Sequence, residues 1–402
     1  MNARKKIIKA AKQGGRLLTV AGLLALTFCF AMFQGGFVSW FVFFTLLPFL
    51  LYSLLLAVMP IRIGELEREI APAKLQRGGK ARVTVRFRNR TILPIVFLAV
   101  RELDLDERFY RVAAGSAGTL FFAGWRRSFE WTYELEDLQR GEHTLSALEV
   151  KATDFFGWVT RHKTIVQPYK LLVYPRTVDM NYASLQVQYD QGALAARYAI
   201  AKDTTLVTGV RDYQAGDRFS WIHWKSFAKN GQLRTKEFED RQSQKLFLCI
   251  DRTVSSRFEE VVELTASMLQ AIVSRNADVA FLSGGDGRVF YPAIRAEAQL
   301  EQVMRHLAVV KADTGLPLEQ LLRNERELNS SILILVTGSM TDGLKGFLTN
   351  GSKYARAVIC FVVVPKEEYA SYKGASMRFT NSRVIYLTKE MFGQAFTEVN
   401  KP

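Results

Sequence analysis

Two uncharged apolar runs near the start of the chain constrain its fold more than any other feature. Residues 17–33 and 37–59 contain no Asp, Glu, Lys or Arg, and Gln34-Gly35-Gly36 separates them. An α-helix rises about 1.5 Å per residue, so roughly 20 apolar residues cross the hydrocarbon core of a bilayer. We therefore predict two transmembrane helices, at residues 17–33 and 37–59, with Pro48 bending the second helix without ending it.

The charges before the first run predict how these helices are oriented. Residues 1–16 form a basic flank without an acidic residue, and such flanks stay in the cytoplasm. Two crossings then return the chain to the cytoplasm at Arg62. A signal peptide is the rival interpretation of the first run, but residues 31–34 make a poor cleavage site. If the first run failed to insert, the body would lie outside.

The overall charge and the cysteines indicate which partners and which cell compartment the protein can have. The 402-residue chain carries a formal net charge of +15, and outside the basic flank its cations are dispersed. Dispersed charge disfavours nucleic acid as the partner, because a nucleic-acid site concentrates cations on one face. Cys29, Cys249 and Cys360 have no Cys or His at metal-ligand spacing, which favours buried thiols in a reducing compartment.

Residues 65–179 alternate in a way that is typical of β-strands. Val83, Val85 and Phe87 alternate with polar residues, and the stretch 128–135 repeats this pattern. Turn sequences such as Arg77-Gly-Gly separate the strands. Several short strands at this spacing predict an antiparallel β-sandwich, immunoglobulin- or fibronectin-like.

Residues 245–402 change to short, fully apolar strands that alternate with helical patterns. Strands are expected at 245–250, 277–282, 332–336, 356–364 and 383–387, with helices at 257–274, 296–310 and 318–328. This order predicts an open parallel sheet covered on both faces. No phosphate-binding glycine motif accompanies it, so nucleotide binding lacks support in the sequence.

The turn after the first of these strands has two interpretations. Asp251-Arg-Thr253-Val-Ser255 resembles the Asp-x-Ser-x-Ser metal site of von Willebrand factor A domains, and its oxygens would suit Mg²⁺, the one cofactor that the sequence indicates. A second Asp is expected after strand 332–336, but Asp342 comes several residues late. The competing interpretation makes Ser256 and Glu259 a capping box for the next helix, with Thr253 or Ser255 serving the turn.

Residues 209–239 concentrate aromatic and charged side chains in the connector between the two halves, residues 180–244. His223 with Asp217 or Glu237 would be an acid–base pair of a hydrolase, but no nucleophile elbow accompanies it. Stacking of Trp221 and Trp224 on bases would be a nucleic-acid mode. The interpretation that we favour is non-enzymatic: indoles and ion pairs at a domain junction or partner surface.

The same run resembles the signature of the bacterial family called domain of unknown function 58, roughly G-x-R-x-Y-x-x-G-D-x-x-R-x-I-x-W-K-x-x-A-R-x-x-x-L-x-x-x-E-F. Ser220 and Lys229 stand where that family usually has Arg. Residues 138–145, 154–158 and 173–176 resemble further family patterns, with Phe155 in place of proline. The matching positions of the signature are Gly209, Arg211, Tyr213, Gly216, Asp217, Ile222, Trp224, Lys225, Ala228, Leu233, Glu237 and Phe238.

The resemblance implies a protein of the bacterial plasma membrane that ends in an A-domain-like α/β part. It further implies, by association only, a scaffold or adaptor working with a MoxR-type AAA+ ATPase and other membrane proteins. We expect the signature residues, with His223, to form an interface and not a catalytic centre. Asp251, Thr253 and Ser255 are the candidates for a metal-dependent protein-binding site.

Overall fold

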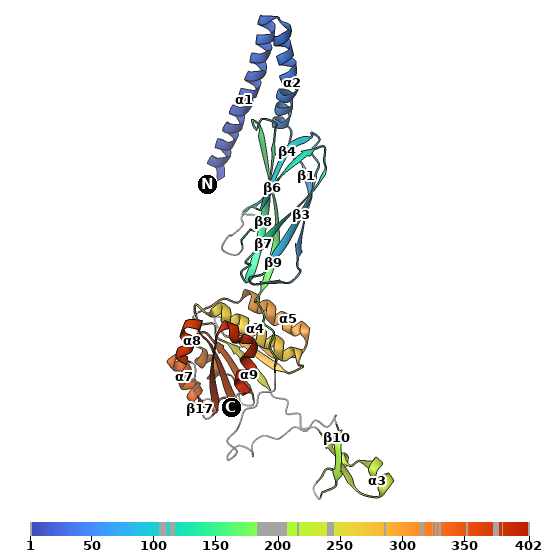
Figure 1. Cartoon of the computed structure of the whole chain (residues 1–402), viewed down its shortest axis with the longest axis vertical. Helices are drawn as coiled ribbons and strands as arrows, with labels where there is room; N and C mark the ends of the chain where they lie inside the picture. The colour runs from blue at the N-terminus through green and yellow to red at the C-terminus, as the bar shows by residue number, and fades with distance from the viewer. Residues whose placement is uncertain are drawn as a thin grey trace. The chain divides into compact units, whose positions relative to one another are not determined.

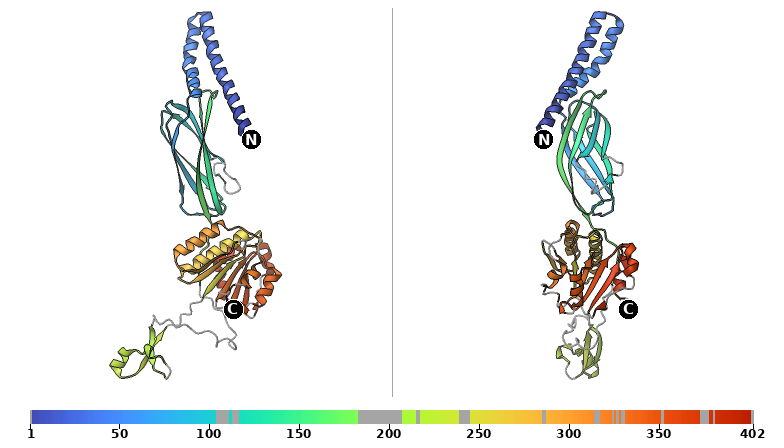
Figure 2. Two further views of the ribbon diagram at one scale, coloured as in Figure 1. Left: turned by 180° about the vertical axis from the view of Figure 1, so that it is seen from behind. Right: turned by 90° about the vertical axis from the view of Figure 1, so that its left-hand side faces the viewer.

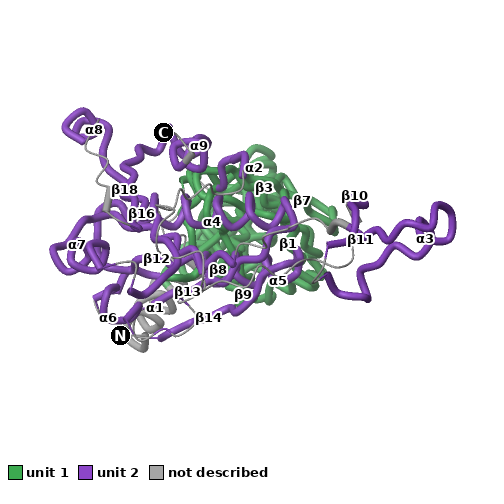
Figure 3. Tube along the Cα trace, turned by 90° about the horizontal axis from the view of Figure 1, so that it is seen from below, with its two compact units in different colours: residues 1–176, 308–310 green, residues 177–307, 311–402 purple. Residues whose placement is uncertain are grey.

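The chain is seen in a computed structural model that describes residues 2–103, 111–112, 117–182, 207–214, 217–238, 245–284, 287–313, 317–323, 325, 328, 331–350, 353–372, 378–379 and 381–400. It divides into two compact units, coloured in Figure 3. Unit 1 holds residues 1–176 and 308–310, and unit 2 holds the remainder.

Unit 1 begins with two helices, α1 (Asn2–Gln34) and α2 (Phe37–Val58). Gly35 takes a left-handed φ of 59° between them, which confirms the predicted break. The helix α2 continues through Pro48, and Phe43 packs against Phe28 of α1 with ring centroids 5.6 Å apart. Among the described residues, α2 is long and apolar enough to cross a membrane, whereas the apolar part of α1, Leu18–Gln34, is shorter.

Two β-sheets follow in unit 1, as Figure 2 shows. One has the order β1-β3-β7-β5 and is antiparallel throughout, and the other has the order β2-β9-β8-β4-β6. The sequence predicted antiparallel pairing only, but the short strand β2 pairs parallel with β9. The strands are β1 (Ile63–Ala71), β2 (Leu75–Gln76), β3 (Ala81–Asn89), β4 (Ile95–Leu103), β5 (Arg111–Val112), β6 (Gly118–Gly124), β7 (Ser128–Glu136), β8 (Gly141–Thr153) and β9 (Thr160–Tyr174).

The core of unit 1 explains the alternation seen in the sequence. Val83 and Val85 of β3 are fully buried and share one cluster with Trp131 of β7, Leu98 of β4 and Val150 of β8. Because side chains alternate across a strand, the intervening polar residues lie on the other face. The two sheets therefore enclose a common apolar core.

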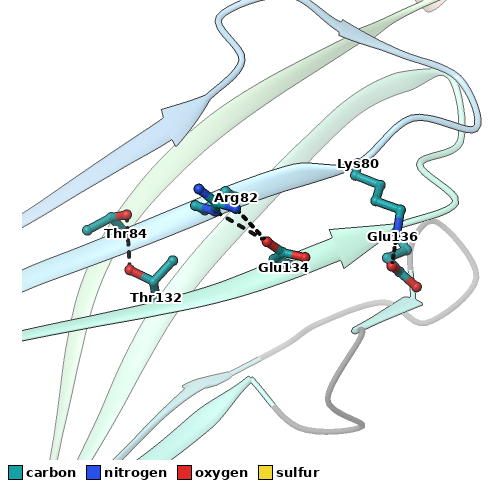
Figure 4. Close-up of polar contacts among 6 residues, drawn as sticks. All are labelled: Lys80, Arg82, Thr84, Thr132, Glu134 and Glu136. Atoms are coloured by element: carbon teal, nitrogen blue, oxygen red, sulfur yellow. Dashed lines mark hydrogen bonds and ion pairs between the residues drawn. The ribbon is translucent and has the colours of Figure 1, made fainter.

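The outer face of β3 and β7 carries paired polar side chains, drawn in Figure 4. Arg82 contacts Glu134 at 3.0 Å, and Lys80 contacts Glu136 at 2.6 Å. These pairs are exposed, and such pairs contribute at most about 1 kcal/mol each. They therefore add little to the stability of the unit.

Unit 2 is built on a seven-stranded sheet in the order β14-β13-β12-β15-β16-β18-β17. The five inner strands are parallel, as predicted. A wholly parallel sheet was expected, and that is wrong at both edges, because β14 and β17 run antiparallel. The strands are β12 (Leu246–Ile250), β13 (Val279–Ser283), β14 (Val289–Ile294), β15 (Ile332–Thr337), β16 (Ala357–Val363), β17 (Arg378–Phe379) and β18 (Ser382–Leu387).

Helices cover both faces of this sheet (Figures 1 and 2). On one face, α6 (Leu318–Arg323) and α7 (Asp342–Thr349) share a core cluster with Phe247 and Cys249. On the other, α4 (Phe258–Ser274) contacts β12, β13 and β15, and α5 (Glu297–Val309) brings His306 against Phe281. The helices α8 (Lys366–Tyr372) and α9 (Ala395–Asn400) complete the layers, with a 3-10 helix at Lys389–Gln394.

Candidate functional site

The stretch with the predicted signature forms a small element of its own, which we call the finger and define as residues 207–214 and 217–238. It consists of β10 (Val207–Asp212), a 3-10 turn (Phe219–Trp221), α3 (Trp224–Asn230) and β11 (Arg234–Phe238). The strands pair antiparallel, so that Gly209 faces Glu237 and Arg211 faces Thr235. Gly216 lies outside the described residues, as do the side chains of Glu237 and Phe238.

Asp217 organises the finger through both of its carboxylate oxygens. Arg211 donates a hydrogen bond to Oδ1 at 2.7 Å, and the Gln214 amide and the Thr235 hydroxyl donate to Oδ2 at 3.0 and 3.1 Å. These donors, Arg211 foremost, lower the pKa of Asp217 to about 2. The predicted ion-pair character is therefore present, and Thr235, which the sequence did not single out, is its buried member.

His223 begins α3 and acts there as a helix cap. Its Nδ1 accepts a hydrogen bond from the Ser226 amide at 3.2 Å, and its own amide donates to the Arg234 carbonyl at 2.8 Å. Gly231 ends α3 with a left-handed φ of 67°. Among the described residues, no hydrogen bond joins the His223 ring to a carboxylate. The geometry thus accounts for this histidine as a cap.

Most apolar side chains of the finger face outward. Phe219 is 76% exposed and Trp224 is 60% exposed, whereas Ile222 is buried at 2%. Among the finger positions whose burial is described, Ile222 is the one buried apolar side chain. A sequence pattern alone gave no signal that Phe219 would lie on the surface.

Cations lie beside these aromatic side chains. The Arg218 guanidinium lies over the Trp221 ring at 5.4 Å from the centroid, and Lys225 and Lys229 are exposed on α3. Exposed aromatic groups next to Arg are typical of protein interfaces, and Lys is found at their polar rim. We name the set Phe219, Trp224, Phe227 and Leu233, each at least 41% exposed, the aromatic surface of the finger.

The second candidate site lies at the carboxyl edge of the sheet in unit 2. Asp251 Oδ1 accepts hydrogen bonds from the Thr253 amide and hydroxyl at 3.0 and 2.7 Å. Asp251 Oδ2 accepts from the Thr337 hydroxyl at 2.6 Å, and Thr337 was not anticipated from the sequence. Ser255 Oγ instead accepts from the Arg257 amide at 3.1 Å. Through the hydroxyl groups of Thr253 and Thr337, Asp251 links the ends of β12 and β15.

This donor set does not fit a divalent cation. Among the described residues, Asp251 is its one carboxylate, and both of its oxygens already accept hydrogen bonds from the chain. Asp342 belongs to the first turn of α7, where its side chain is 97% exposed and pairs with Lys345. Mg²⁺ favours several anionic or carbonyl oxygens in octahedral geometry, which this arrangement does not provide.

The capping prediction for the following helix is also wrong. The helix α4 begins at Phe258, and its N-cap is Arg257, which makes no side-chain capping bond. Ser255 serves the turn, as the alternative interpretation held, whereas the helix begins one residue later than a capping box with Ser256 as the N-cap requires. The hydroxyl groups therefore act in the turn between β12 and α4.

Comparison with known proteins gives two sequence findings. Residues 209–375 match the family described as "Protein of unknown function DUF58", and the match begins within the finger. The chain is also 32% identical over 336 residues to the uncharacterized protein YeaD of Bacillus subtilis (strain 168), covering 82% of this chain and 84% of the relative.

Two solved structures are similar to part of the chain. One is a von Willebrand factor type A protein from Catenulispora acidiphila, with 15% identity, a TM-score of 0.27, and coverage of 41% of this chain and 43% of that one. The other is the SpRpn10 VWA domain, with 10% identity, a TM-score of 0.27, and coverage of 39% and 93%.

Proposed function

The chain belongs to the DUF58 family, and on that premise we propose that it is a membrane-anchored, non-enzymatic adaptor whose finger binds a partner protein. The observation that carries the proposal is the aromatic surface of the finger. Phe219 and Trp224 expose most of their surface area. The finger buries few apolar side chains of its own. An exposed apolar patch rimmed by polar residues marks an interaction site.

Anchoring is the second part of the proposal. The helix α2 has the length and apolarity of a membrane span, and the basic residues before α1 favour a cytoplasmic N-terminus. With α1 as the other crossing, a two-pass topology would leave the sheets of unit 1 and the whole of unit 2 in the cytoplasm of a bacterial cell. The absence of disulfide bonds among the cysteines, all free, is compatible with this compartment.

The partner that we propose is a MoxR-type AAA+ ATPase, the association that the family resemblance implies. Lys225 and Lys229, beside the aromatic surface, fit a partner that offers apolar pockets rimmed by acidic side chains. The hydrolase alternative centred on His223 has less support, because the His223 ring serves as a cap. The Mg²⁺-dependent alternative has less support because the part of the chain that the structure describes offers no second carboxylate beside Asp251.

Site-specific photo-crosslinking in membranes tests this function. A photoreactive amino acid replaces Phe219 in the finger, and the control replaces Val166, which is 76% exposed on β9. We expect position 219, but not 166, to yield a crosslinked product containing the MoxR-type ATPase of the same genome. Failure to find the ATPase at position 219 in membranes that contain both proteins would overturn the proposal.

A further inference from the structure

The carboxyl-terminal part of α2 is fastened to one end of the sheets in unit 1. Ser53 Oγ donates a hydrogen bond to Asp154 Oδ2 at 2.6 Å. The Tyr52 hydroxyl donates to the Pro94 carbonyl at 2.9 Å and accepts from the Val96 amide at 3.2 Å. The loop 154–158, which joins β8 to β9, therefore lies directly beside α2.

The contacts of this loop reach well inside the apolar helix. The Phe49 ring lies 5.3 Å from Phe155 and 5.7 Å from Phe156, measured between centroids. Phe49 precedes the end of α2 at Val58 by about 13 Å, at ~1.5 Å per residue. A helix of this length only just spans a hydrocarbon core of about 30 Å. The loop tip thus lies alongside the part of α2 that would be in lipid.

The loop has the chemistry that such a position requires. Phe155 and Phe156 are 47% and 48% exposed, and Trp158 stacks on Phe156 at 4.6 Å. The one carboxylate, Asp154, is fully buried and accepts hydrogen bonds from Ser53 and from the Val159 amide. A satisfied and buried carboxylate removes the main cost of bringing the loop into lipid.

Arginines lie where the helix ends. Arg62 is exposed four residues after Val58, and its carbonyl accepts a hydrogen bond from the Arg90 amide at 2.7 Å. The Arg90 side chain is 58% exposed and pairs with the exposed Glu65 at 3.2 Å. Aromatic side chains at the acyl boundary with Arg at the phosphates are the arrangement of an interfacial membrane anchor.

We propose that loop 154–158 inserts into the bilayer beside α2, with Phe155 and Phe156 among the acyl chains at the level of Phe49 and with Arg62 and Arg90 against the lipid phosphates. The loop makes unit 1 a body held at the membrane surface, with α2 as one attachment and the loop as another. The inference rests on the proposed anchoring by α2 and adds to it a specific lipid contact.

Depth measurement by spin labelling tests the insertion in the full chain, reconstituted in vesicles of phosphatidylcholine and phosphatidylglycerol. Cys29→Ala removes the exposed thiol, while Cys249 and Cys360 are fully buried and stay. Nitroxides are placed by Phe156→Cys in the loop and by Val166→Cys on β9. Position 166 lies about 20 Å along β9 from Thr160, at ~3.3 Å per residue. A third label, Phe44→Cys, reports on α2 itself.

We expect the label at 156 to collide with oxygen more than with a water-soluble nickel chelate, as at 44, and the label at 166 to show the reverse. If the label at 44 is in lipid while the label at 156 has the same accessibility as the label at 166, the loop is in water. The inference is then wrong, although the anchoring holds. If 44 and 156 are both in water, the anchoring itself fails. A second measurement places the label at the neighbouring residue by Phe155→Cys. We expect the substitution Phe156→Ser to move the label at 155 toward water.

Discussion

The sheet of unit 2 and the finger use their aromatic residues in opposite ways, although they are neighbours in the sequence. Phe247, Phe281 and Phe361 of the sheet are completely buried, whereas Phe219 and Trp224 of the finger are mostly exposed. Burying a side chain of this size contributes about 1.5–3 kcal/mol, so the sheet stabilises itself from within. The finger gains little in this way, and its aromatic residues are available for another molecule.

The largest effect that separates the two regions is expected from Phe361→Ala in β16. It removes a fully buried ring from the middle of the parallel sheet, and such changes cost about 3–5 kcal/mol. Hydrogen exchange resolved by segment should show faster exchange across β12, β15 and β16. The matched change in the finger, Phe219→Ala, should leave that exchange unchanged. An equal increase in exchange across the sheet in both variants would contradict the comparison.

Asp251→Ala should give the next largest effect. It leaves the Thr253 hydroxyl without its acceptor and leaves the Thr337 hydroxyl with the Ser339 carbonyl alone, and a buried donor that loses its partner costs about 1–3 kcal/mol. Asp251→Asn keeps one acceptor oxygen and should lose less. Thermal unfolding of the purified chain measures both changes.

Magnesium binding is a separate test of the same cluster. Because the cluster provides one carboxylate, we expect calorimetric titration with Mg²⁺ to give no binding heat that depends on Asp251. A saturable heat that disappears in Asp251→Ala would contradict the structural role and restore the metal site.

Acid should disorder the finger before the sheet. Arg211 and the Gln214 amide hold the pKa of Asp217 at about 2, below its ordinary value of 3.8. A carboxyl group whose pKa is lower in the folded chain than in the unfolded chain stabilises the fold at pH values above its unfolded pKa. For Asp217 this contribution is lost as the pH falls from about 4 to 2. Residues 245–402 contain no tryptophan, but four lie in unit 1, so the fluorescence of the finger is read as the difference between the chain and its Trp221→Phe, Trp224→Phe variant. In Asp217→Asn the change over this pH range should disappear; if it persists, another group is responsible.

Trp224→Ala should have the smallest effect on stability. The side chain is 60% exposed and contacts Phe227 at its edge, so we expect a change within about 0.5 kcal/mol. Chemical denaturation checks this value. A loss comparable to that of Phe361→Ala would mean that the finger, like the sheet, uses its aromatic residues as a core.

Local patterns predicted the parts of the fold that local physics determines. Alternation at Val83 and Val85 predicted β3, and the apolar run at residues 332–336 predicted β15, because burial on one or both faces fixes the residue types. The strand β14 was missed since Pro292 and its half-exposed neighbours do not resemble a buried strand; an edge tolerates them. The Gly35 break between the two apolar helices was predicted from the sequence.

The candidate site was less predictable, because its contacts join distant residues. The bond from Thr235 to Asp217 spans eighteen positions, and the bond from Thr337 to Asp251 spans eighty-six. No spacing rule reports such pairs. The sequence marked Asp217 and Trp224 through their place in the signature, but the outward position of Phe219 and the capping role of His223 follow from how the finger folds.

The affinity of the full chain, in detergent, for the purified MoxR-type ATPase of the same genome tests the central claim most directly. We expect Trp224→Ala to weaken binding at least tenfold, as the loss of an aromatic hot spot does. We expect Trp125→Ala, at a tryptophan of unit 1 that is 71% exposed, to leave binding unchanged. Unchanged binding by Trp224→Ala, or equal losses from both variants, would contradict the finger as the partner-binding surface.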